Sequence, residues 1–284
     1  MLASLSEGRC QISGLLEGED CLATIDVFRK MGVDIYSSDG NYLIEGNGLK
    51  GLKQPNESLD FGNSGTSIRL CSGVLSAQSF ATTLLGDESL SLRPMQRIVE
   101  PLTLMGAKIL PSKDGTLPLS ILPTDSLQSI EYTLPVASAQ VKSCIMFAGL
   151  FAKGETKITE EVVTRNHTET MFNAFGIPVE TSTSGDQKTI SLSRVEAIKP
   201  ANIDICGDFS SASFFILAAL ISPDSEILIK NVGVNATRTG LLHALRHMGA
   251  NIELLNEDEA YEPTADILVR SSNLKGISLN SALV

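Results

Sequence analysis

Apolar residues recur with one spacing around four glycines of this chain, Gly32, Gly106, Gly176 and Gly249. In each case apolar residues lie four and one positions before the glycine, and one and three positions after it. The spacing before the glycine is helical, whereas the alternation after it is typical of a strand. Each pattern therefore predicts a helix that ends at a C-cap glycine and leads into a strand. Because successive glycines are separated by about 70 to 74 residues, the pattern indicates an internal repeat.

A second helix is predicted upstream of three of these glycines. Apolar runs follow Ser64, Ser138 and Ser211, which are typical residues of a helix start. Strand-like runs then follow at 81–85, 156–160 and 226–232, and further strands are predicted from Asn41, Thr189 and Asp266. The repeat unit therefore reads strand, helix, strand, helix, strand, which predicts an α/β architecture of similar units packed around shared cores.

The same period predicts how the chain is divided. The polar stretch from Ala197 to Asp208 is the expected crossing between lobes, so we expect a first lobe at 1–203 and part of a second at 204–284. The serine-rich helix start that belongs with Gly32 would fall before Met1, and the last unit ends early at Val284. We therefore expect the chain to be cut at both ends relative to a complete set of repeats.

Composition and charge argue against several classes of function. The chain has 284 residues, 43% of them hydrophobic, with a net charge of −11 and no block of consecutive basic residues. This balance argues against nucleic acid or an anionic membrane surface as partner. The longest apolar run, 214–221, is far shorter than the roughly 20 residues of a membrane span, and no signal peptide is evident. Five widely spaced cysteines without a CxxC motif are typical of reduced thiols in a cytoplasmic protein; they are Cys10, Cys21, Cys71, Cys144 and Cys206.

The stretch from Asp60 to Leu70, DFGNSGTSIRL, carries the clearest candidate chemistry. Its glycines allow close backbone approach to a ligand, and its hydroxyl and amide side chains can cap the helix that follows. Free amides at a helix start, with Arg69 one turn further on, would attract an anion. The alternative interpretation is an ordinary capped helix after a glycine turn.

An arginine precedes three of the repeated helices, at Arg93, Arg165 and Arg238. Arginine opposes the dipole at a helix start, so its recurrence favours contact with a bound carboxylate or phosphate. The alternative is a salt bridge to one of the 33 acidic residues. His167, next to one of these arginines, suits either a substrate contact or a cap. No GxSxG, P-loop or GxGxxG motif is present, so hydrolase, NTPase and dinucleotide-enzyme functions lack their basic signals.

Several strings together resemble a known family. They are GNSGTSIRL, GDESLSLRPM, ASAQVKSC, TRNHTE, GDFSSASFF and NATRTGL, in this order. In sequence and spacing they closely resemble the 5-enolpyruvylshikimate-3-phosphate (EPSP) synthases of the shikimate pathway, and the resemblance covers essentially the whole chain. It implies an α/β fold, the enolpyruvyl transferase-like two-lobe inverse α/β barrel built from repeated βαβαββ units.

The resemblance also implies a reaction and its ligands. The enolpyruvyl group of phosphoenolpyruvate would be transferred to the 5-hydroxyl of shikimate 3-phosphate, with release of phosphate and without a metal or organic cofactor. The residues implied for phosphoenolpyruvate are Asn63, Gly65, Thr66, Arg93 and Gln140. Those implied for shikimate 3-phosphate are Ser138, Ala139, Gln140, Thr164 and Arg165. Supporting positions are Arg69, Lys142 and His167. The complete enzyme would be a cytoplasmic monomer, and the small Gly65 would admit glyphosate to the phosphoenolpyruvate site.

The departures from the family pattern lie at the ends. The family's Lys-Ser-x-Ser-His-Arg motif would precede Met1, and its Ile-Asp-Glu-x-Pro segment with the catalytic aspartate would follow Val284. We therefore expect no catalytic residue within this chain and no turnover by the chain alone. Two alternatives stay open: a UDP-N-acetylglucosamine enolpyruvyl transferase, and a non-catalytic truncated paralogue that serves as a binding module.

Overall fold

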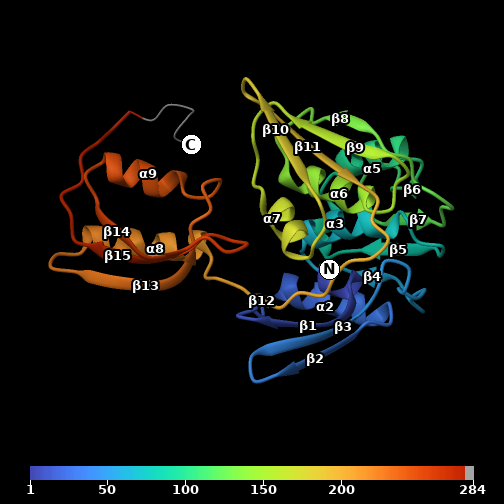
Figure 1. Cartoon of the computed structure of the whole chain (residues 1–284), viewed down its shortest axis with the longest axis horizontal. Coiled ribbons are helices and arrows are strands. Elements are labelled where there is room, and N and C mark those ends of the chain that lie inside the picture. Colours follow the sequence, from blue (N-terminus) through green and yellow to red (C-terminus); the bar gives the residue numbers. More distant parts are fainter. Residues whose placement is uncertain (279–284) are drawn as a thin grey trace. The chain divides into compact units, whose positions relative to one another are not determined.

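The computed structural model describes residues 1–278, which form two compact units (Figure 1). Unit 1 consists of Met1–Thr164 and Phe172–Ile203, and unit 2 of Arg165–Met171 together with the chain from Asp204 onward. The segment 165–171 therefore belongs to unit 2, although the expected boundary assigned it to the first lobe. The division into lobes 1–203 and 204–284 stays a prediction, and its last six positions lie outside the described residues.

Three four-stranded sheets of unit 1 share one strand order, which confirms the internal repeat. In each sheet, hydrogen bonds join a short strand, the strand after a buried helix, the closing strand and the strand after a repeat glycine. The first sheet is β12 (Ile203–Asp204), β1 (Glu7–Ser13), β3 (Asn41–Asn47) and β2 (Asp34–Ser38). The second is β4 (Leu59–Asp60), β5 (Thr82–Leu85), β7 (Leu119–Leu122) and β6 (Lys108–Leu110). The third is β8 (Glu131–Thr133), β9 (Glu155–Glu160), β11 (Gln187–Ser193) and β10 (Glu180–Ser184).

The four repeat glycines end helices as predicted. The helices are α2 (Glu19–Lys30), α5 (Gln96–Leu104), α7 (His167–Ala174) and, in unit 2, α9 (Gly240–His247). Each glycine just beyond them has a positive φ, from 72° at Gly176 to 92° at Gly106. Glycine adopts this left-handed conformation without a Cβ penalty, so the predicted C-caps are confirmed. A short helix that the pattern did not predict, α4 (Glu88–Ser91), precedes α5.

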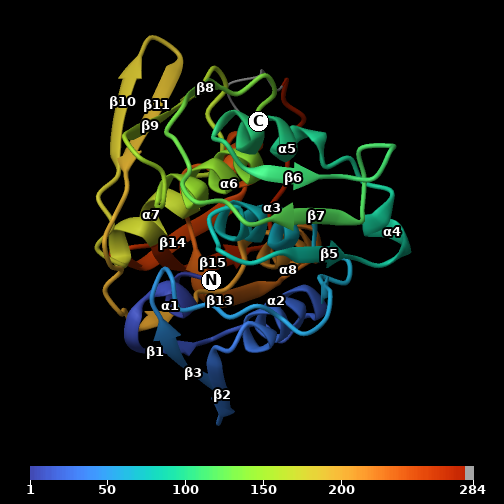
Figure 2. The same cartoon turned by 90° about the vertical axis from the view of Figure 1, so that its right-hand side faces the viewer.

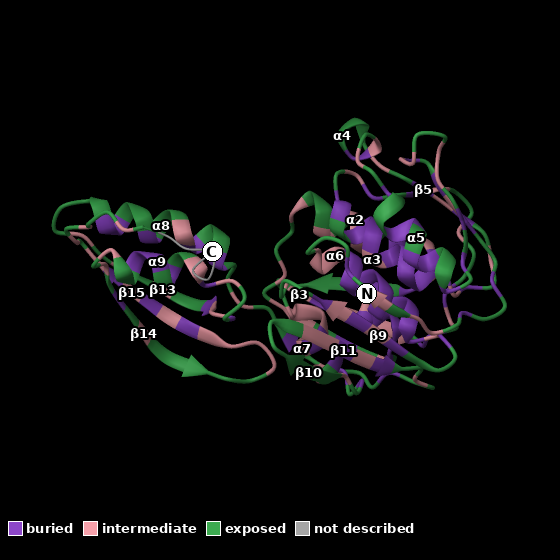
Figure 3. Cartoon of the chain, turned by 90° about the horizontal axis from the view of Figure 1, so that it is seen from above, coloured by how far each residue is buried: buried purple, intermediate pink, exposed green. Residues whose placement is uncertain are grey.

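Buried helices fill the centre of unit 1. They are α1 (Leu2–Leu5), α3 (Gly65–Leu75) and α6 (Ala139–Gly149), and in Figure 2 the three sheets lie around α3 and α6. The helices α3 and α6 approach closely, since a Cβ on Gly73 would lie 2.2 Å from the carbonyl oxygen of Cys144. Every residue of α6 from Val141 to Gly149 is buried. Figure 3 shows that buried residues gather on the central helices of unit 1. Ser64 and Ser138 cap these two helices, as predicted.

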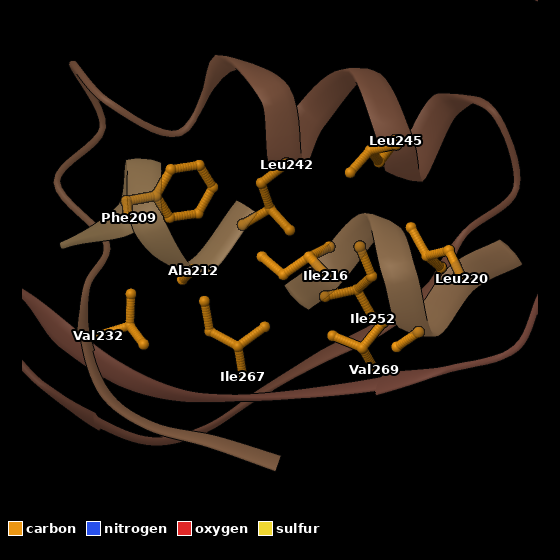
Figure 4. Packing of buried hydrophobic residues seen from close by; sticks show 11 residues of the cluster. Phe209, Ala212, Ile216, Leu220, Val232, Leu242, Leu245, Ile252, Ile267 and Val269 are labelled. Atoms are coloured by element: carbon orange, nitrogen blue, oxygen red, sulfur yellow. The ribbon is translucent and has the colours of Figure 1, made fainter. Parts of the chain in front are cut away.

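The described part of unit 2 contains a three-stranded antiparallel sheet, the helices α8 (Phe209–Ile221) and α9, and the start of α7. The sheet order is β13 (Glu226–Gly233), β15 (Thr264–Arg270) and β14 (Asn251–Asp258). The buried side chains of α8 and α9 point toward those of the sheet, and Ile216 and Ile267 are fully buried among them (Figure 4). The cap of α8 is Asp208, which accepts a hydrogen bond from the amide of Ser211 and lies three residues before this predicted serine.

Although α8 is apolar on most of its circumference, it has only 13 residues. Within residues 1–278, none of the helices is both long and apolar enough to cross a membrane.

Candidate anion-binding site

The start of α3 presents backbone amides beside two guanidinium groups. Ser64 caps the helix by accepting a hydrogen bond from the amide of Ser67 at 3.3 Å. A Cβ on Gly65 would lie 3.0 Å from Nη1 of Arg93 and 3.2 Å from Nη1 of Arg69. The absence of a side chain at position 65 therefore leaves both guanidinium groups open toward the first turn of the helix, where the dipole favours negative charge.

Arg93 is oriented by a chain of polar contacts. Its guanidinium donates to Oδ1 of Asn63, and the amide of that side chain donates to Oδ2 of Asp87 at 2.7 Å. Asp87 in turn caps α4 by accepting the amide of Leu90 at 2.7 Å. This backbone hydrogen bond, together with that from Asn63, lowers the pKa of the Asp87 carboxyl. The carboxylate thus fixes Asn63, which fixes Arg93 beside Gly65.

Arg69 is the buried member of this group, with 6% of its surface exposed. Its Nη1 donates to Oε1 of Gln140 at 2.5 Å, whereas its buried Nε has no hydrogen-bond partner among the described residues. Burial, followed by the nearby charges of Arg97 and Arg93, lowers the pKa of this guanidinium. Three guanidinium groups that repel one another electrostatically favour an anion as ligand, because an anion would relieve their repulsion.

Gln140 joins the starts of two buried helices. Its Oε1 accepts from Arg69 on α3, and its Nε2 donates to the hydroxyl of Thr66 at 2.8 Å. The same residue lies in the first turn of α6, directly after Ala139. The structure therefore brings together the predicted residues of α3 and α6 that the sequence separates by more than seventy positions.

The start of α6 offers a second set of donors. Ser138 has an extended backbone and caps the helix by accepting the amide of Val141 at 3.4 Å. Ala139 is the first helical residue, so its amide has no partner within the helix. These two positions, with Gln140, have the geometry expected of an anion site at a helix start.

Thr164 is connected to α6 through two buried charges. Its hydroxyl and its amide both donate to Oε1 of Glu160, the amide at 3.2 Å. The other carboxylate oxygen, Oε2, lies 3.1 Å from Nζ of Lys142 on α6, and neither side chain is exposed. Lys142 is therefore a structural partner of Glu160 within unit 1, one helical turn beyond Ser138.

Arg165 and His167 belong to the segment that packs with unit 2. Arg165 is exposed. Nε2 of His167 lies 3.4 Å from Oε1 of Glu262, and the preceding Asn166 accepts a hydrogen bond from the buried Asn235 at 2.8 Å. Burial lowers the pKa of the His167 imidazole, opposed by Glu262 and assisted by neighbouring arginines. These contacts explain why 165–171 packs with unit 2.

The third candidate arginine, Arg238, pairs with the start of α8. Its guanidinium donates to the hydroxyl of Ser210 and lies 3.8 Å from the carboxylate of Asp208. The structure therefore supports the salt-bridge interpretation of Arg238 rather than an open guanidinium.

Sequence reasoning missed Asp87, Glu160 and Glu262, which contact residues of the candidate site, and Arg97, whose charge lowers the pKa of Arg69. For Glu160 a signal was present. It lies on a strand whose alternate positions, Thr156 and Ile158, are buried, so an acidic residue at the next inward position needs a partner. Asp87 and Glu262 contact partners that are distant in sequence, and Arg97 acts on Arg69 through its charge, so the periodicity of apolar residues gives no signal for these three.

The cysteines show no sign of a nucleophile. All five are free, and burial raises the pKa of Cys71 to about 12 and raises that of Cys144 as well. Since the thiolate is the reactive form, these two thiols are inert at neutral pH. Among the described residues, no group of three or more His, Cys, Asp or Glu side chains is placed to hold a metal ion.

The repeated units define an α/β protein, and the guanidinium groups beside Gly65, with the helix start joined to it through Gln140, form a candidate site for anionic ligands. Comparison with known proteins then identifies the family. The sequence profile of EPSP synthase (3-phosphoshikimate 1-carboxyvinyltransferase) matches residues 1–282. This chain therefore belongs to the EPSP synthase family, and its fold is that of the enolpyruvyl transferases.

Individual relatives support this family assignment. The 3-phosphoshikimate 1-carboxyvinyltransferase of Hydrogenovibrio crunogenus is 48% identical over 287 residues, covering 100% of this chain and 64% of the relative. The enzyme of that name from Methylococcus capsulatus is 49% identical over 281 residues, covering 98% and 63%. A solved EPSP synthase from Acinetobacter baumannii superposes with a TM-score of 0.92 at 47% identity and covers 100% of this chain and 64% of that one. The chain thus spans slightly less than two thirds of the length of these relatives.

Proposed function

We propose that unit 1 binds two anions side by side, phosphoenolpyruvate at the start of α3 and shikimate 3-phosphate at the start of α6. The observation that carries this proposal is the side chain of Gln140, which contacts Thr66 and Arg69 on α3 from the first turn of α6. A single amide therefore borders both helix starts, as a reaction between two neighbouring ligands requires.

For phosphoenolpyruvate, the support is electrostatic. The ligand carries a carboxylate and a phosphate, both of which match guanidinium groups bidentately. Arg93 and Arg69 face the position where Gly65 lacks a side chain, and the loop with Asn63 and Thr66 limits the space. The buried Nε of Arg69 without a partner adds a donor for the same anion.

For shikimate 3-phosphate, the support is the second helix start. The hydroxyl of Ser138 and the amide of Ala139 lie at the positive end of the α6 dipole. Thr164, linked to α6 through Glu160 and Lys142, would supply a further hydroxyl.

The proposed reaction of the protein is enolpyruvyl transfer between these ligands. The 5-hydroxyl loses its proton to a base as its oxygen bonds to C2 of phosphoenolpyruvate, and C3 gains a proton from an acid, which gives a tetrahedral intermediate. The bond from C2 to the phosphate oxygen then breaks, C3 loses a proton, and the double bond is restored as phosphate leaves. The residues described above bind and orient the two substrates, which is the contribution we assign to unit 1. The five free cysteines further support a reducing, cytoplasmic location.

Calorimetric titration of the purified chain tests the proposal, because binding can be measured without turnover. Shikimate 3-phosphate is expected to bind at low salt, whereas shikimate, which lacks the phosphate, is expected to bind much more weakly. Gln140→Ala should weaken binding by about tenfold, or about 1.4 kcal/mol. UDP-N-acetylglucosamine serves as the comparison ligand. Preference for the sugar nucleotide, or no binding by a folded sample, would contradict the proposal.

A further inference from the structure

The buried pair Lys142 and Glu160 has been assigned no contact with a ligand, yet it links Thr164 to helix α6. Glu160 ends β9, and its Oε2 lies 3.1 Å from Nζ of Lys142 with both side chains fully buried. Its Oε1 accepts two hydrogen bonds from Thr164. Lys142 in turn donates its amide to the carbonyl of Ser138 at 3.1 Å. An unbroken chain of polar contacts thus runs from the α6 start to Thr164.

Stability alone is a weak explanation for this pair. Removing two charges from water is expensive, and replacing a buried ion pair by apolar side chains of similar volume is often neutral or stabilising. Unit 1 already has a dense apolar core around α6. What an apolar pair would not supply is the acceptor that holds the amide and hydroxyl of Thr164.

We propose that Lys142 and Glu160 are positioning residues that hold Thr164 in register with the first turn of α6, so that one phosphate group can contact both. The inference rests on the proposed binding of shikimate 3-phosphate. A hydroxyl has one hydrogen to donate, so on ligand binding the Thr164 hydroxyl turns from Glu160 to a phosphate oxygen, while the backbone amide keeps Glu160 as its acceptor. Lys142 neutralises the carboxylate, which would otherwise repel the phosphate.

Two double variants distinguish the role of the hydrogen-bond acceptor for Thr164 from the role of the two buried charges. Lys142→Met with Glu160→Gln removes both charges but keeps an amide oxygen for Thr164. Lys142→Met with Glu160→Met removes the charges and the acceptor together. Both avoid leaving a single buried charge, which would be strongly destabilising, and circular dichroism checks that each variant is folded.

The first measurement is hydrogen exchange at the Thr164 amide, which needs no ligand. The amide is expected to be protected in the wild-type chain and in the Met/Gln variant, and to exchange at least tenfold faster in the Met/Met variant. Equal protection in all three would overturn the inference, whether or not shikimate 3-phosphate binds.

The second measurement is calorimetric affinity for shikimate 3-phosphate. The Met/Gln variant is expected to bind within about threefold of wild type and the Met/Met variant at least tenfold more weakly. Thr164→Val should weaken binding of shikimate 3-phosphate in the wild-type background. In the Met/Met variant it should cause no further loss of affinity, because the effects of coupled residues are not additive. Equal affinity of the two double variants, or full additivity of Thr164→Val, would overturn the positioning role. If the wild-type chain did not bind shikimate 3-phosphate, but the Thr164 amide lost its protection from exchange in the Met/Met variant, the proposed function would be refuted. The positioning of Thr164 by Lys142 and Glu160 would still hold.

Discussion

The helices α6 and α8 occupy corresponding places in their repeats but differ in what covers them. In α6, buried residues run without interruption from Val141 to Gly149. In α8, Phe209, Ile216 and Leu220 are buried, whereas Phe214 is 75% exposed and Ile221 is 73% exposed. Both helices are apolar on most of their circumference, so sequence alone makes them look alike. The difference teaches that a central helix of this fold is buried only where several repeats surround it.

The polar residues at the N-terminal ends of α6 and α8 also differ. The first turn of α6 is joined through Gln140 to Arg69, whose pKa is lowered by burial and by the charges of Arg97 and Arg93. At α8, Asp208 occupies the cap and pairs with Arg238 within the described part of unit 2. A carboxylate at the cap fills the place that an anionic ligand would take. The comparison therefore locates the candidate site at the helix starts of unit 1.

The largest expected effect is a test of helix burial with a matched pair of phenylalanines. Phe147 on α6 is 4% exposed and stacks edge-on against Phe172 at a centroid distance of 5.2 Å. Phe147→Ala should lower the free energy of unfolding by about 3–5 kcal/mol, the usual range for a buried phenylalanine. Phe214→Ala on α8 should change it by no more than about 0.5 kcal/mol.

Denaturant titration followed by circular dichroism measures both changes. Binding of a hydrophobic dye, which should fall with Phe214→Ala, gives an independent control. Equal losses of stability in the two variants would contradict the difference in burial between α6 and α8.

A smaller effect is expected at the open start of α3. Gly65→Ala places a methyl group 3.0 Å from Nη1 of Arg93 and 3.2 Å from Nη1 of Arg69, in the space assigned to phosphoenolpyruvate. Affinity for phosphoenolpyruvate should fall by about tenfold, or 1.4 kcal/mol. Stability should be unchanged or slightly higher, because alanine is the better helix former.

Calorimetry and thermal unfolding measure these two quantities on the same samples. Gly276→Ala is the matched control, since a Cβ there would meet nothing within 4 Å. If Gly65→Ala left ligand affinity intact, the assignment of the α3 start would be wrong. Glyphosate, the inhibitor that the family resemblance implies, should lose affinity in the same variant.

The pH dependence of unit 2 gives the smallest effect. Burial lowers the pKa of His167 in the folded chain, so the folded state favours the neutral imidazole. The unfolded chain then binds more protons below its ordinary pKa of about 6.5, and stability falls as pH drops through that value toward the folded pKa. His167→Gln should flatten this dependence, measured as the unfolding midpoint between about pH 7.5 and pH 5.5. An unchanged slope would show that other groups control it.

Sequence reasoning recovered the repeat because its signal is local. A C-cap glycine with positive φ, such as Gly106, requires only its own neighbours, and so do the serine caps of α3 and α6. The orienting residues escaped because their partners are distant in sequence. Asp87 contacts Asn63 across 24 positions, and Glu160 contacts Lys142 across 18.

A co-crystal structure of the chain with shikimate 3-phosphate tests the central claim most directly. The account predicts the phosphate at the start of α6, within hydrogen-bond distance of Ser138, the Ala139 amide and Thr164. Gln140 should border the ligand on the side of α3. A phosphate bound instead at the start of α8, beside Arg238, would contradict the assignment of the site to unit 1.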